Sequence, residues 1–230
     1  MILRIRLNYH YQKKQSRENI SQSLNSIFPI KDTEEALQNH SFKKAYEIHK
    51  KLYACMINKT DFDENDIDVC IELYKQAFAN GILEAAANHL SLILFIGYSL
   101  YLMTPELYES FENLDVNITS LGDLVSYGLL PNFTDNLQEE YDELDIFRKE
   151  FIKENNQTTL NYINKLKKSQ NYAFLGDYYL ALRYIFGLVN NSLSAEMNNT
   201  IGYEMMRTFS AIGNKYARTF IGLVNDFLNN

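Results

Sequence analysis

Apolar side chains recur every three or four residues along most of the chain, which is the spacing of amphipathic helices. The earlier stripes are Phe42, Ala45, Tyr46, His49, Tyr53 and Met56, then Ile67, Cys70, Ile71, Tyr74, Ala77 and Phe78. The later stripes are Leu137, Tyr141, Leu144, Phe147 and Phe151, then Tyr172, Leu175, Tyr179, Leu182 and Phe186, and finally Ala217, Phe220, Val224, Phe227 and Leu228. With only three prolines and nine glycines, the chain lacks the frequent turns of an all-β fold. We therefore expect an all-α protein of seven or eight helices in stacked antiparallel hairpins.

The first dozen residues follow a different period. Apolar residues from Leu3 to Tyr11 alternate with polar residues from Arg4 to Gln12, as in a half-buried strand. No second strand is evident, so this segment either pairs between chains or is the start of a helix. We divide the chain into an N-terminal extension (1–32), helical hairpins (33–112), an irregular connection (113–136) and further hairpins (137–230), all within one continuous domain.

One stretch raises the possibility of a membrane helix. Residues 85–105 carry no charge, and "LSLILFIGYSLYLM" at 90–103 is strongly apolar, nearly long enough to cross a bilayer. Polar side chains such as Asn88 and His89 interrupt it, and no cluster of Lys and Arg flanks it. Because a helix at the centre of a helical domain is also apolar all round, we interpret the stretch as a buried helix.

The first residues and the number of cysteines indicate in which cellular compartment the protein is found. Arg4 and Arg6 fall where a secretory signal would need its apolar region. The only cysteines, Cys55 and Cys70, are too few for a disulfide framework and suit a reducing compartment. These features favour a cytoplasmic protein.

Charge is distributed very unevenly. Residues 1–60 hold 11 basic and 5 acidic side chains, residues 61–150 hold 3 and 19, and residues 151–230 hold 8 and 5. The middle of the chain therefore has a net charge of −16. Either this part consists of solvated helix faces that the basic ends attract, or it steers a basic partner. Direct binding of nucleic acid by this part is disfavoured, because phosphate would be repelled.

The acidic stretch "DFDENDIDVCIE" at 61–72 resembles a calcium loop, with oxygen ligands at Asp61, Asp63, Asn65 and Glu72. The glycine that makes the sharp turn in such loops is replaced by Asp66. The alternative is the start of a helix capped by Asp61 or Asp63, with further carboxylates favoured by the helix dipole. We interpret the stretch as a helix start and predict no metal site.

Other catalytic and cofactor motifs are missing from the sequence. The four histidines have no paired metal spacing, and there is no nucleophile elbow, phosphate loop or dinucleotide fingerprint. His49 and His89 lie on or beside apolar stripes, where a hydrogen-bonded core histidine is the usual finding. We expect Tyr178, Tyr179 and Tyr184 to line the core or a groove. The sequence therefore predicts neither an enzyme nor a cofactor.

A partial internal repeat appears at a shift of 132 residues. "IELYKQAFANGILEAAANHLSL" (71–92) then aligns with "YEMMRTFSAIGNKYARTFIGLV" (203–224), and Gly81 coincides with Gly213. Together with "LGDYY" (175–179), these segments resemble Sel1-like repeats, a branch of the tetratricopeptide-like helical hairpins. The usual glycine soon after the Tyr is missing, and the copies are irregularly spaced. The resemblance covers 71–102 and 170–228 and implies a protein-binding scaffold without catalytic residues.

We therefore expect a protein-binding helical scaffold, and more specifically a bacterial immunity protein that inhibits a basic toxin through an acidic surface. The expected partner-binding residues are Asp61, Asp63, Glu64, Asp66, Asp68, Glu139, Glu140, Asp142, Glu143 and Asp145. The alternative is a receptor or regulator that binds a peptide or small molecule in an aromatic groove.

Overall fold

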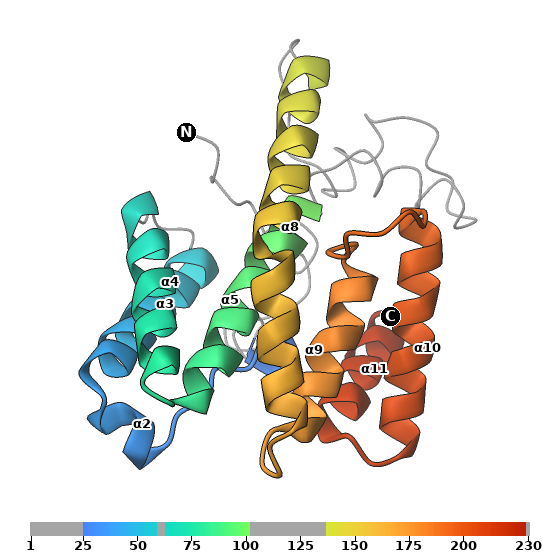
Figure 1. Cartoon of the computed structure of the whole chain (residues 1–230). Helices are drawn as coiled ribbons and strands as arrows, with labels where there is room; N and C mark the ends of the chain where they lie inside the picture. The colour runs from blue at the N-terminus through green and yellow to red at the C-terminus, as the bar shows by residue number, and fades with distance from the viewer. Residues whose placement is uncertain (1–24, 59–62, 102–136, 229–230) are drawn as a thin grey trace.

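The computed structural model describes residues 25–58, 63–101 and 137–228. These residues form the end of a helix at 25–27, eight further helices and no strand (Figure 1), so the predicted all-α fold is confirmed. The helices are α2 (Glu34–Gln38), α3 (His40–Asn58), α4 (Glu64–Ala79), α5 (Leu83–Tyr101), α8 (Leu137–Lys167), α9 (Ala173–Ile185), α10 (Ala195–Ala211) and α11 (Lys215–Leu228). The strand expected near the N-terminus and the irregular connection at 113–136 lie outside the described residues.

Each helix packs against its neighbours in sequence order, as expected for stacked hairpins. The successive contacts join α3 to α4, α4 to α5, α5 to α8, α8 to α9, α9 to α10 and α10 to α11. An additional contact between α5 and α9 links the two halves of the stack. Most of the predicted stripe residues whose side chains are described face inward, with Phe42, Tyr74 and Leu182 among those that are fully buried. The stripe of α8 is the exception, because Phe147 is exposed and Phe151 is half-buried.

Glycine ends both helices of the aligned repeat. Gly81 follows α4 with φ of 90°, and Gly213 follows α10 with φ of 96°, a conformation that side chains disfavour. After α4, the N–H of Ile82 donates to the carbonyl of Ala77 over 3.1 Å, and an equivalent 2.9 Å bond follows α10. This bonding satisfies carbonyls at the helix end and reverses the chain. Gly81 and Gly213 therefore have the same helix-ending role in the two aligned segments.

Two other glycines allow helices to approach closely. A Cβ on Gly202 in α10 would lie 2.6 Å from the backbone nitrogen of Ile185 in α9. A Cβ on Gly176 would lie 2.9 Å from the backbone nitrogen of Lys167 at the end of α8. Gly176 belongs to the "LGDYY" segment, so the structure gives this glycine a packing role between α8 and α9.

The apolar stretch that raised the membrane alternative forms α5, which lies in the middle of the stack (Figure 1). Its side chains from Ala85 to Ile96 are buried against neighbouring helices. Within the described residues, none of the helices combines the length and the apolar character needed to span a bilayer. The interpretation as a buried helix is confirmed.

Candidate functional site

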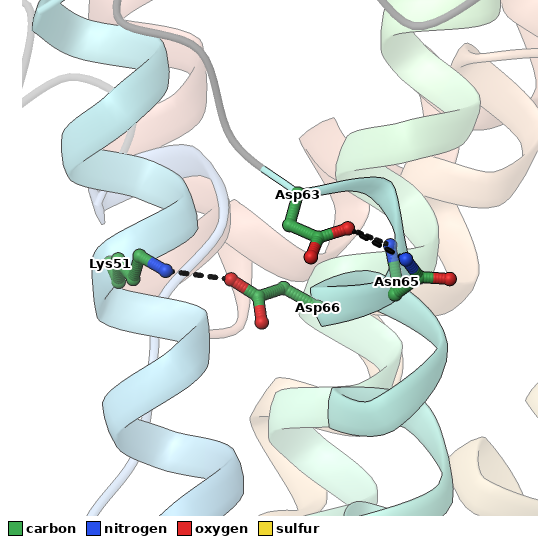
Figure 2. A network of polar contacts seen from close by, with 4 residues as sticks. All are labelled: Lys51, Asp63, Asn65 and Asp66. Atoms are coloured by element: carbon green, nitrogen blue, oxygen red, sulfur yellow. Dashed lines mark hydrogen bonds and ion pairs between the residues drawn. The ribbon is translucent and has the colours of Figure 1, made fainter.

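The acidic stretch begins α4 (Figure 2). The Asp63 carboxylate accepts hydrogen bonds from the backbone N–H of Asn65 at 3.0 Å and from its Nδ2 at 2.8 Å. Asp63 is thus the N-cap of the helix, and this cap satisfies backbone donors that would otherwise lack a partner. Asp66, one turn later, forms a 2.8 Å ion pair with Lys51 of α3. These two carboxylates therefore stabilise the fold.

The helical structure of this stretch is incompatible with a calcium loop. Asn65 and Glu72 both lie in α4, and seven residues of helix separate two positions by about 10.5 Å. A calcium loop instead turns sharply so that these two positions meet at one ion, and a continuous helix lacks that turn. Among the described residues, no group of three or more His, Cys, Asp or Glu is arranged to hold a metal ion.

The other predicted partner-binding residues are placed only in part. Asp68 is exposed on α4, and Glu64 is the first residue of that helix. The cluster Glu139, Glu140, Asp142, Glu143 and Asp145 lies in α8. Asp61, and the side chains of Glu64 and of the α8 cluster, lie outside what the structure describes. A single acidic surface that combines both clusters therefore stays a prediction.

The two predicted core histidines are buried and hydrogen-bonded. Nδ1 of His49 lies 3.1 Å from the Tyr74 hydroxyl, and Nδ1 of His89 lies 3.2 Å from the Tyr162 hydroxyl. Burial lowers the pKa of each imidazole to about 3, since a buried charge is unfavourable. Both rings are therefore neutral near neutral pH, as core histidines should be.

A short stretch at the start of the described chain, helical only at Ile27, enters the helical stack. We call Ile27–Lys31 the Phe28 segment; Figure 1 shows it in dark blue, leading from α2 to the middle of the molecule behind α5 and α8. The sequence analysis placed these residues in an N-terminal extension, yet Phe28 is fully buried. Its ring centroid lies 5.4 Å from that of Phe95, 5.7 Å from Tyr98 and 5.8 Å from Phe186. The Phe28 side chain thus occupies an aromatic pocket between α5 and the end of α9.

Three tyrosine hydroxyls donate to successive backbone carbonyls of the Phe28 segment. Tyr178 donates to the carbonyl of Ile27 over 2.8 Å and Tyr179 to that of Pro29 over 3.1 Å, both from α9. Tyr53 of α3 donates to the carbonyl of Phe28 over 3.3 Å. Buried carbonyls need such partners, and here side chains provide them in place of a neighbouring strand.

Asn88 of α5 binds both backbone groups of Lys31. Its Nδ2 donates to the Lys31 carbonyl over 2.8 Å, and its Oδ1 accepts from the Lys31 N–H over 2.6 Å. The Lys31 ammonium lies 4.8 Å from the centroid of the Tyr216 ring of α11, within range of a cation–π contact. Side chains of α3, α5, α9 and α11 therefore contact the five residues of the Phe28 segment.

Burial keeps these tyrosine hydroxyls protonated. It raises the pKa of Tyr53, and it raises the pKa of Tyr178 and Tyr179 well above the ordinary range, because desolvation disfavours the phenolate. Each hydroxyl is thus a hydrogen-bond donor at neutral pH. In this structure the hydroxyls donate to the carbonyl oxygens of the Phe28 segment.

Polar contacts also fix the chain where it leaves the Phe28 segment. The Tyr46 hydroxyl donates to the Asp32 carboxylate over 2.7 Å. Glu84 accepts from the hydroxyl of Thr33 over 3.0 Å and from that of Tyr172 over 2.8 Å. Thr33 is also the N-cap of α2. The segment is therefore followed directly by a fixed helix start.

We use the name tyrosine groove for six buried side chains that hold the segment, namely Tyr53, Asn88, Phe95, Tyr178, Tyr179 and Phe186. Sequence reasoning expected Tyr178 and Tyr179 to line the core or a groove, and the structure places both hydroxyls on the Phe28 segment. Sequence reasoning did not identify Asn88 as part of the site, because Asn88 looked like an interruption in an apolar helix. It did not identify Phe28 either. The Phe28-Pro29 pair was the available signal, since a residue before proline disfavours helix.

Comparison of the chain with protein-family models, with curated proteins and with solved structures finds no match. The resemblance to Sel1-like repeats therefore stays a prediction that rests on the turn residues and the "LGDYY" segment.

Proposed function

We propose that this chain is a protein-binding helical scaffold that receives an elongated peptide segment of a partner in the tyrosine groove. The observation that supports this function is the way in which the Phe28 segment is held. Its main-chain groups are bound by Tyr53, Asn88 and the two α9 tyrosines, while one aromatic side chain fills a pocket. Main-chain hydrogen bonds supply affinity and side-chain pockets supply specificity in known modes of peptide recognition.

The groups in the groove favour binding over catalysis. The tyrosine hydroxyls have raised pKa values, so they do not act as general bases at neutral pH. Asn88 is an amide without acid–base chemistry in this range. Donors aimed at carbonyl oxygens fit a polypeptide ligand, whose backbone repeats the same acceptor at every residue.

Selection from a displayed library of random peptides tests this function. The baits are the full chain, a Phe28→Ala variant that weakens the internal segment, and a Phe28→Ala/Asn88→Ala variant that also weakens the groove. We expect enrichment on Phe28→Ala that exceeds enrichment on the wild type and is reduced in the double variant. Circular dichroism confirms that each bait is helical. Equal recovery on all three folded baits would refute a peptide-binding groove.

The exposed carboxylate on α4 favours a second candidate, inhibition of a basic partner. Asp68 is exposed on α4, within the part of the chain that carries a net charge of −16. Complementary charge raises association rates. For a basic protein that the chain binds, Asp68→Lys should slow association and flatten its salt dependence more than Asp68→Asn does. Identical kinetics for both variants and the wild type would remove this candidate.

A further inference from the structure

We propose that the Phe28 segment is a displaceable internal ligand and that the partner peptide carries the same pattern. That pattern is an apolar residue, Phe, Pro, a second apolar residue, and Lys or Arg. This inference rests on the proposed peptide-binding function and specifies which peptide the groove selects. It also implies that the chain occupies its own site until a competitor arrives.

The Phe position follows from the aromatic pocket. Phe28 is fully buried, and the rings of Phe95, Tyr98 and Phe186 surround it with centroid separations of 5.4 to 5.8 Å. The Phe95 ring meets it at 80°, an edge-to-face arrangement that aromatic pairs favour. An aliphatic residue would lose this geometry, so the pocket selects an aromatic side chain.

The preference for Pro at the third position of the pattern follows from the hydrogen-bonding groups that face the backbone there. From Ile27 to Pro29, the groove offers tyrosine hydroxyl donors to three consecutive carbonyls. Pro29 is buried and has no N–H, so it requires no acceptor in return. Any other residue there would bring a buried donor that must find a partner. Proline also keeps the preceding Phe28 out of the helical conformation.

The last position combines a backbone contact with a side-chain contact. Asn88 binds both main-chain groups of Lys31, whatever the side chain. The ammonium above the Tyr216 ring adds a preference for a cation, which Arg also satisfies. This is the one position where charge distinguishes between competing peptides.

The segment belongs to the core at its centre and is only partly covered at its ends. Phe28 and Pro29 are buried, whereas Ile27, Ile30 and Lys31 are half-buried and Asp32 is exposed. The contacts that hold it are main-chain hydrogen bonds and one aromatic pocket, which a second peptide with the same residues can reproduce. A tethered ligand has an effective concentration on the order of millimolar, so the free peptide competes well only when the internal copy is weakened.

The test uses a fluorescent peptide of residues 25–33, "NSIFPIKDT", and the full chain. Anisotropy is measured with the wild type, with Phe28→Ala and with Phe28→Ala/Asn88→Ala. The control peptide has Ala in place of Phe. We expect the peptide to bind Phe28→Ala about tenfold more tightly than the wild type, because the internal competitor is weakened. The control peptide and the double variant should each lose about tenfold of that affinity.

Two further measurements guard against variants that merely fold poorly. The peptide should raise the thermal midpoint of Phe28→Ala, and the control peptide should not. Lys31→Glu changes only a half-buried side chain, so it provides a second weakened segment with an intact pocket. Affinity unchanged from the wild type in both variants, or equal binding of the two peptides, would overturn the proposal.

The outcomes also separate this inference from the proposed function. Library peptides that require Asn88 but lack the Phe-Pro pair would leave the function standing and overturn the inference. Failure of both the library and the "NSIFPIKDT" peptide would reject both. Exchange of the segment between two copies of the chain, seen as a dimer that the peptide dissociates, would support displacement.

Discussion

The two buried histidines should make the folded state sensitive to mild acid. His49 is packed against Tyr53 and Tyr74, and His89 against Tyr74 and Tyr162. The charged groups that influence them are the other histidine for His49 and Lys75 for His89, and both lower the pKa further. No carboxylate is among these influences, so a proton on either ring is unfavourable.

The sign of the effect follows from proton binding in the two states. An unfolded histidine binds its proton near pH 6.5, whereas each folded pKa is about 3. The unfolded chain thus binds more protons between these values, and stability falls as the pH falls. Each histidine removes about 2 kcal/mol between pH 7 and pH 5, and the pair about 4 kcal/mol. That is a large share of a typical stability of about 5–15 kcal/mol.

Urea unfolding followed by circular dichroism at several pH values between 5 and 7 measures this loss. His49→Phe and His89→Phe should each halve the pH dependence of the free energy of unfolding. The double variant should nearly abolish this dependence, whatever the stability of each variant at pH 7. The exposed His40 provides the control, since His40→Gln should leave the dependence intact. A double variant with the same pH dependence as the wild type would refute the reasoning, because the protons would then bind elsewhere.

Three further predictions concern the fold and the groove. Gly202→Ala should lower the free energy of unfolding by about 1–3 kcal/mol because its Cβ would meet the α9 backbone, whereas Gly222→Ala, with open space around it, should not; urea unfolding compares them. Asp63→Ala removes the cap of α4 and should cost about 1 kcal/mol in the same assay, while Asp68→Ala should change stability little. Asn88→Ala leaves two backbone groups of the Phe28 segment unpaired, which should cost about 1–3 kcal/mol. Hydrogen exchange should also speed up at the segment, and unchanged protection there would contradict the assigned contact.

Local patterns in the sequence were sufficient to predict the helices. The stripe from Phe42 to Tyr53 needs only a period of 3.6 residues to predict a helix, and α3 buries most of it. Gly81 and Gly213 likewise end helices through their own backbone freedom. The acidic start of α4 was also readable, because a cap acts within three residues of its own position.

The candidate site could not be predicted in the same way, because its contacts are distant in sequence. Ile27 and Tyr178 are separated by 151 residues, and Lys31 and Asn88 by 57. No local period joins such positions. The ion pair of Asp66 with Lys51 has the same cause, since it requires α3 and α4 to be packed first. Sequence reasoning therefore assigned the Asp66 carboxylate to a partner surface, while the structure shows it paired within the chain.

The composition of the core becomes understandable once the Phe28 segment is placed. A segment that is mostly non-helical and packed among helices has no neighbouring strand, so side chains must satisfy its buried carbonyls. Tyrosine suits this task because its long apolar ring packs in the core while its hydroxyl donates at the far end. Of the chain's 17 tyrosines, Tyr53, Tyr178 and Tyr179 have this role. A core designed only for helix packing would use Leu or Phe there, with no donor for a backbone. These hydroxyls thus match the carbonyl acceptors of a peptide backbone, which in this structure is the chain's own.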